Sequence, residues 1–227
     1  MIGGLDGCRA GWVLVTGPAE DNGATAVVVV PDITPVIAMI DEGELAAVGI
    51  DIPIGLPERG SRRCDIEARR LIGARRSSVF PAPARAVLGA PTFEEANRRA
   101  REVSGRGISR QAFNILPKIE EVDLVMTNER QQVLVEAHPE ASLAALAGTP
   151  MAHHKASPEG RAERLAVLRT RFRHVDDHVA GRRPGARPDD VLDAFATAWS
   201  ARRWLAGTHR QLGGDVDRRG LRMEIIV

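Results

Sequence analysis

The residues best placed to do chemistry in this chain are acids at the ends of apolar segments. Asp6, Asp51 and Glu136 each lie at the end of a segment that resembles a β-strand. Strand ends of an open α/β sheet meet at one edge, where ligands bind, so we expect these three acids to converge. An unpaired carboxylate is costly to bury, so Asp51, in an otherwise apolar run, requires a partner.

Two further acids lie on the last long predicted helix. Asp190 and Asp193 are three residues apart, which places them on one helix face. Carboxylates gathered this closely repel one another unless a cation compensates, and oxygen ligands without cysteine suit Mg²⁺ or Mn²⁺. The predicted metal ligands are Asp6, Asp51, Glu136, Asp190 and Asp193.

Such a cluster can hold two divalent ions that activate water and stabilise the leaving oxygen of a phosphodiester. His138 follows Glu136 by two residues, on the same strand face, and could relay a proton. The predicted catalytic residues are Asp6, Asp51, Glu136, Asp193 and His138. Structural alternatives remain open: a turn at Asp6, an edge position for Glu136, a helix-start preference for Asp190, and a structural histidine at His138.

Basic residues could contact substrate phosphates. We assign this role to Lys118, Lys155, Arg75 and Arg76. The alternative is that these side chains are solvated, because arginine is used throughout the chain and the formal net charge is only +1. Aromatic residues make up 4% of the chain and tyrosine is absent, which argues against an aromatic stacking platform for single strands.

The predicted elements place these residues on an α/β fold. Strands are expected over 2–6, 11–16, 24–30, 46–52 and 132–137, and helices over 31–41, 65–72, 93–103, 112–126, 140–147, 158–172 and 189–205. The first three strands form an antiparallel meander, and a crossover returns the fourth beside the first, in parallel. We expect one domain over 1–227 with a helical insertion over 58–128, and residues 221–227 as an edge strand or a packed tail.

Five segments together resemble a bacterial family of unknown function described as predicted RNase H-like nucleases. They are Asp6–Trp12, Gly49–Pro57, Ser77–Pro83, Glu136–Glu140 and Asp189–Ala194. The resemblance implies an RNase H-like mixed sheet, with Asp6, Asp51 and Asp193 as metal ligands and Glu136 or Asp190 completing the set. The final helix is also similar to that of Holliday-junction resolvases, but the chain lacks the basic character common in junction-binding enzymes.

The sequence therefore predicts a nuclease or phosphodiesterase that depends on Mg²⁺ or Mn²⁺ and acts on nucleic acid. Two alternatives stay open: a non-catalytic nucleic-acid or protein-binding module, and a phosphotransferase of the actin and sugar-kinase type. We expect a cytoplasmic protein, because no apolar run is long enough to cross a membrane, no export signal is present and the two cysteines form no C-x-x-C pair. As for partners, we expect nucleic acid as the substrate, and a homodimer stays open.

Overall fold

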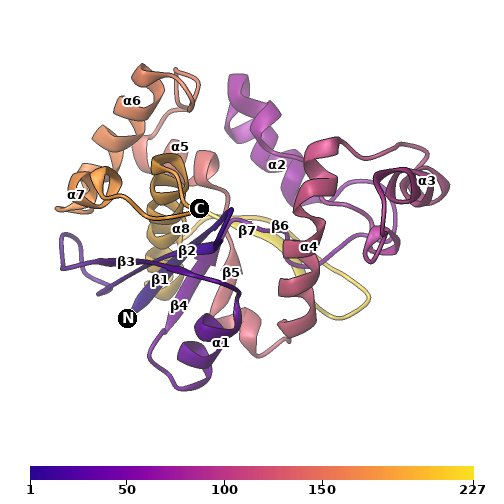
Figure 1. The fold of residues 1–227 in the computed structure, drawn as a ribbon, viewed down its shortest axis with the longest axis horizontal. Coiled ribbons are helices and arrows are strands. Elements are labelled where there is room, and N and C mark those ends of the chain that lie inside the picture. The colour runs from indigo at the N-terminus through magenta and orange to yellow at the C-terminus, as the bar shows by residue number, and fades with distance from the viewer.

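The computed structural model describes residues 1–227 and is built around a five-stranded mixed sheet (Figure 1). The strand order is β3-β2-β1-β4-β5. An antiparallel meander of β1 (Ile2–Cys8), β2 (Gly11–Gly17) and β3 (Ala26–Val30) is followed by β4 (Ala47–Ile50) and β5 (Leu134–Glu136), which run parallel to β1. The predicted α/β fold with a mixed sheet is confirmed, as is the return of the fourth strand beside the first.

Helices flank both faces of this sheet. They are α1 (Thr34–Asp41), α2 (Arg63–Leu71), α3 (Phe93–Ser104), α4 (Arg110–Val125), α5 (Pro139–Ala147), α6 (Pro158–Arg169), α7 (Val175–Ala180) and α8 (Pro188–Leu205). Short 3₁₀ turns are η1 (Gly73–Ser78), η2 (Arg85–Val87) and η3 (Arg130–Gln132). Apolar side chains of α1 and α4 share one core with the sheet, and those of α5, α6 and α8 share the core on the other face.

Several boundaries differ from the sequence prediction. β1 runs past Asp6 to Cys8, because its hairpin with β2 continues, while β4 ends just before Asp51. The helix expected over 158–172 ends at Arg169, and the six-residue α7 was not predicted. The C-terminal segment forms β7 (Arg222–Ile226), which pairs with β6 (Gln211–Val216) in a separate two-stranded sheet. Two glycines interrupt β6 and hid it from the sequence pattern.

The backbone of α8 lies directly against β1 and β4. A Cβ atom on Gly4 would lie 2.1 Å from the carbonyl oxygen of Ala194, and one on Gly49 would lie 2.2 Å from that of Thr197. The hydroxyl of Thr197 donates to the carbonyl of Leu5 at 3.3 Å. Only glycine at the two strand positions leaves room for this approach.

The same two glycines set the direction of the neighbouring acids. Gly4 is paired with Gly49 across the parallel strands, and each is followed two residues later by an aspartate, Asp6 or Asp51. Because side chains alternate along an extended chain, each aspartate faces the side on which α8 lies. The Gly-x-Asp pattern in both strands therefore brings the helix and the carboxylates together.

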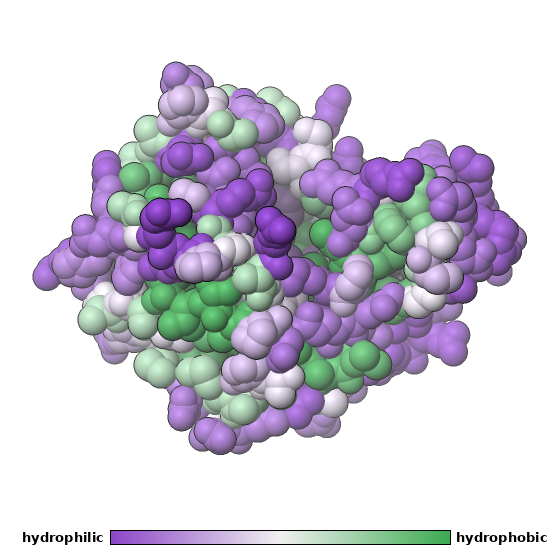
Figure 2. Space-filling model, in the orientation of Figure 1, coloured by the Kyte–Doolittle hydropathy of each residue, from purple (hydrophilic) through white to green (hydrophobic).

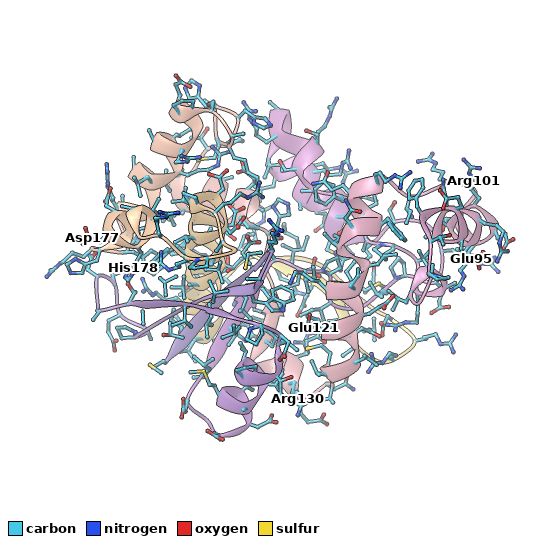
Figure 3. The ribbon with its side chains drawn as sticks, viewed as in Figure 1. Glu95, Arg101, Glu121, Arg130, Asp177 and His178 are labelled. Atoms are coloured by element: carbon cyan, nitrogen blue, oxygen red, sulfur yellow. The ribbon has the colours of Figure 1, made fainter.

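On the opposite face, a part-buried carboxylate of α4 adds polar contacts to the apolar packing of this helix on the sheet. The carboxylate of Glu121 accepts hydrogen bonds from the indole N–H of Trp12, at 3.0 Å, and from the backbone N–H of Ile33. Figure 3 shows Glu121 on α4, beside the start of α1. This contact holds Lys118, one helical turn earlier, at the end of the β1–β2 hairpin.

The visible surface in Figure 2 is mostly hydrophilic. A hydrophobic area lies left of centre, where Figure 1 places β2 and β3, and Val28 of the edge strand β3 is 50% exposed. None of the helices combines the length and apolar character that a membrane crossing requires.

Replacing Gly4 with alanine tests the close helix contact. Gly4→Ala forces the backbone of α8 away from β1 and should lower the free energy of unfolding by about 1–3 kcal/mol, the usual cost of overpacking. Gly3→Ala is the matched control, because its Cβ would meet only side-chain atoms, the nearest at 3.3 Å. Urea unfolding of both variants measures the difference, and an equal effect would contradict the contact.

Candidate functional site

A cavity of about 560 Å³ lies at the carboxyl ends of β1, β4 and β5. The N-terminal turn of α8, one face of α4, the start of α2, the segment 75–83 and the segments before and after α5 complete its walls. The predicted acids that line it are Asp6, Asp51, Glu136, Asp190 and Asp193. The structure thus places all five of them around one cavity, but their surroundings differ.

Asp6 and Asp51 have no hydrogen-bond donor from the protein. Asp6 is 8% exposed, whereas Asp51 is partly exposed at the cavity wall. Burial raises the pKa of Asp6 well above its ordinary value, and the charges of Asp193 and Asp51 raise it further. Burial also raises the pKa of Asp51, to about 6, with His138 opposing and Asp193 adding. Both carboxylates are therefore costly to ionise in this site.

Asp193 forms a salt bridge with Lys155, whose ammonium group lies near the other acids. The Lys155 ammonium donates to Oδ2 of Asp193 at 2.8 Å. The charge of Asp193 raises the pKa of Lys155 above its ordinary value, and Asp51 and Asp6 act in the same direction. No three His, Cys, Asp or Glu side chains are gathered closely enough to hold a metal ion as they stand. Lys155 compensates part of the negative charge in this arrangement.

Asp190 belongs to the first turn of α8. One of its oxygens accepts a hydrogen bond from the backbone N–H of Arg187 at 2.8 Å, which caps the helix. Burial raises its pKa, with the Arg187 backbone contact opposing. The helix-start role that the sequence left open for Asp190 is thus present in the structure, beside its place on the cavity wall.

Glu136 is held in a buried ion pair. Arg62 donates to both of its oxygens, at 2.6 and 2.7 Å, and the backbone N–H of Ile54 donates at 2.7 Å. Arg62 is 2% exposed and also pairs with Asp65. Burial disfavours the charge of Arg62, but Glu136 and Asp65 outweigh it and raise the pKa of the guanidinium. Burial still raises the pKa of Glu136, to about 7, with Arg62 opposing, but Glu136 has a paired guanidinium whereas Asp6 and Asp51 have no donor from the protein.

His138 caps the N-terminus of α5. Its Nδ1 accepts from the backbone N–H of Ala141 at 3.4 Å, which leaves Nε2 to donate to the carbonyl of Ser78 at 3.3 Å. The imidazole lines the cavity and lies close enough to Asp51 to lower its pKa. Both ring nitrogens are engaged, in line with the structural alternative for this residue.

The four residues predicted to contact phosphates differ in their surroundings, and Lys155 is the one that pairs with Asp193. Lys118 lines the cavity, donates to the carbonyl of Gly11 at 2.6 Å and lies 4.2 Å from the ring centre of Trp12. Arg75 also lines the cavity, but it donates to the carbonyls of Met151 and Ala152. Arg76 is exposed and is not part of the cavity wall, so the structure does not place it with the other residues.

A second buried ion pair was not predicted. Arg164 and Glu140 are 2% and 4% exposed and are joined by two hydrogen bonds of 2.7 Å. Arg164 also donates to the carbonyl of His153, two residues before Lys155. It therefore fixes the loop that carries Lys155. In a chain so rich in arginine, no local pattern distinguishes Arg62 or Arg164 from solvated arginines.

Two substitutions should distinguish the paired acid from the unpaired ones. Glu136→Gln leaves Arg62 buried without its full counter-charge and should cost about 3–5 kcal/mol of stability. Asp51→Asn removes a repulsive charge that no protein donor satisfies, so the variant should be at least as stable as the parent. Urea unfolding without added metal tests this contrast, and stabilisation by Glu136→Gln would refute the ion-pair assignment.

The pKa of Asp51 also predicts how stability depends on pH. Its folded-state value of about 6 exceeds the ordinary 3.8, so the folded protein holds this proton more tightly than the unfolded chain. The resulting stability is present below the ordinary value and is lost as the pH rises through about 6. In metal-free buffer, the parent should lose stability across this window and Asp51→Asn should lose less. Thermal unfolding of both proteins at a series of pH values measures the difference, and parallel curves would contradict it.

The comparisons with known proteins identify a family. No curated protein and no solved structure matched the chain. One family model, described as "Protein of unknown function (DUF429)", matches residues 4–218. This match includes all of the five-stranded sheet except the first two residues of β1, together with α8 and every acid of the cavity. The chain therefore belongs to the DUF429 family.

Proposed function

We propose that this protein is a nuclease or phosphodiesterase that depends on Mg²⁺ or Mn²⁺. One observation carries the proposal. Asp6 and Asp51 share a cavity with Asp193, have no donor from the protein, and have raised pKa values because of burial and mutual repulsion. A site that gathers carboxylates and compensates them only in part, through Lys155, is suited to a further cation, and perturbed acids in a cavity are typical of functional sites.

We also propose that the domain is RNase H-like. The antiparallel meander followed by parallel strands supports this assignment, because it is the sheet that the family resemblance implies. Asp6 lies in β1, Asp51 directly follows β4 and Asp193 lies in α8. These are the three residues that the family resemblance implies as metal ligands.

The donor atoms of this site have the chemistry that a hard divalent ion prefers, although no three of the acids are close enough to hold an ion as they stand. Asp6, Asp51 and Asp193 would hold it, since each offers carboxylate oxygens to the cavity, and Asp190 lies beside them. Glu136 lies outside this proposed set, because Arg62 and Ile54 already occupy its oxygens. The bound ion would supply an activated water and a counter-charge for the leaving oxygen.

The remaining residues would bind and orient the substrate. Lys118 donates one hydrogen bond, to the carbonyl of Gly11, and its other ammonium protons could meet a phosphate at the cavity wall. Lys155 would exchange Asp193 for a substrate phosphate once a divalent ion compensates the acids. His138 would hold the wall through Ser78 and α5. This division gives metal binding to Asp6, Asp51 and Asp193, substrate contacts to Lys118 and Lys155, and positioning to His138.

Cleavage assays test the proposed activity. Purified protein incubated with labelled RNA, DNA and RNA–DNA hybrid in Mg²⁺ or Mn²⁺ should cut at least one of them. Asp51→Asn and Asp193→Asn should each lower the rate by at least about 100-fold, the upper range for losing even an outer-sphere metal partner.

Asp177→Asn serves as a matched control. Figure 3 shows Asp177 on α7, away from α4, and its side chain is 83% exposed. This variant should retain full activity. Cleavage that survives both Asp51→Asn and Asp193→Asn would rule out the proposed function. A non-catalytic binding module would bind nucleic acid without cleaving it and would not be stabilised by Mn²⁺.

A further inference from the structure

One phenylalanine in the cavity has no aromatic or cationic partner. The chain contains five phenylalanines. Phe93 stacks edge-to-face with Phe113 at 5.7 Å, and Phe172 with Phe195 at 5.0 Å. Phe80 takes part in no such pair, is only half-buried and lines the cavity. Phe80 is thus a partly exposed aromatic residue of the cavity wall that pairs with no other aromatic or cationic side chain.

The loop that carries Phe80 is held in place on both sides. Before it, the carbonyl of Val79 accepts from Arg69 at 3.0 Å, and that of Ser78 accepts from His138. After it, the backbone N–H of Ala82 donates to the buried Asp65 at 3.0 Å. The prolines at 81 and 83 further restrict the chain. Little conformational freedom remains to be lost when a ligand meets this wall.

A face of α4 provides the polar part of the same cavity. Gln111, Asn114, Ile115 and Lys118 line it at helical spacing. Lys118 lies at the β1–β2 hairpin, close enough to Asp6 for their charges to interact. At about 1.5 Å of rise per residue, Asn114 lies roughly 6 Å and Gln111 roughly 10 Å farther along the helix. Neither amide forms a hydrogen bond within the protein, although both reach the cavity.

We infer that Phe80 and this face of α4 form a binding site for one nucleobase. The inference rests on the proposed function, since it places the base beside a phosphate held at the carboxylates and Lys118. Phe80 would stack on the ring, Ile115 would supply apolar contact, and the two amides would meet the polar edge of the base. The spacing along α4 gives the separation that a phosphate and its own base require.

This arrangement selects the form of the nucleic acid. A base inside a duplex is stacked on both faces and paired along its edge, so it cannot meet Phe80 and the amides together. The substrate class is therefore a nucleic acid with an unpaired nucleotide at the cleavage position, such as a single strand, a frayed end or an extruded base. With one free aromatic residue, the site accommodates a single base rather than a stacked run.

Binding of small ligands tests the base site without requiring cleavage. Calorimetry in Mn²⁺ compares nucleoside 5′-monophosphates with ribose 5-phosphate, which has the same phosphate but no base. At least one monophosphate should bind about 10- to 100-fold more tightly, the range expected for stacking on one aromatic side chain. Phe80→Ala should abolish this preference while leaving the affinity for ribose 5-phosphate unchanged.

Two further variants separate recognition from folding. Phe80→Leu keeps apolar volume and should lose most of the preference, because it lacks an aromatic face. Asn114→Ala replaces an exposed amide without hydrogen bonds in the protein, so it should fold normally and weaken monophosphate binding several-fold. Thermal unfolding of each variant verifies the fold.

The outcomes distinguish this site from the catalytic proposal. A Phe80-dependent preference in a protein that cleaves no oligonucleotide would support the base site and overturn the nuclease. Equal cleavage of single strands and blunt duplexes, unaffected by Phe80→Ala, would support the nuclease and overturn the base site. Equal affinity for monophosphates and ribose 5-phosphate, or no binding of any monophosphate, would also overturn it.

Discussion

The contact between α8 and the strands β1 and β4 is the constraint on which the site depends. Gly4 and Gly49 allow the helix backbone to rest on the sheet, and the aspartate two residues after each glycine faces the same side. Any larger residue at these two positions would lift α8 and carry Asp193 away from Asp6 and Asp51. The positions of the carboxylates thus depend on glycine, which has no side chain, at residues 4 and 49.

Two buried ion pairs have a different role, because they hold together the helices and the strand that form the outer walls of the cavity. The pair of Arg62 and Glu136 ties the start of α2 to β5, and the pair of Arg164 and Glu140 ties α6 to α5. Each guanidinium also donates to backbone carbonyls, which satisfies donors that burial would otherwise leave unpaired. The cavity therefore contains two kinds of acid. Arginines pair with Glu136 and Glu140, whereas no donor from the protein contacts Asp6 or Asp51.

Much of this could be predicted from the sequence, and the remainder has physical reasons. Asp51 was identifiable because a lone acid in an apolar strand is costly, and the parallel return of its strand followed from the short connection before α1. The repeated Gly-x-Asp pattern was also present, but its meaning depends on the helix that packs against it. The partner of Glu136 could not be predicted, because long-range pairing of an arginine leaves no local signal. β6 was missed since glycine makes a strand resemble a turn.

The contact between Lys155 and Asp193 has a consequence for any ion that enters the cavity. Such an ion would not fill a vacant site but would displace an ammonium group, so its apparent affinity would reflect an exchange rather than simple addition. The displaced group is tethered and would remain at a high local concentration beside the acids. The loop lysine would thus compete with any incoming ion, and the hydrogen bond from Arg164 to the carbonyl of His153 holds its loop in place.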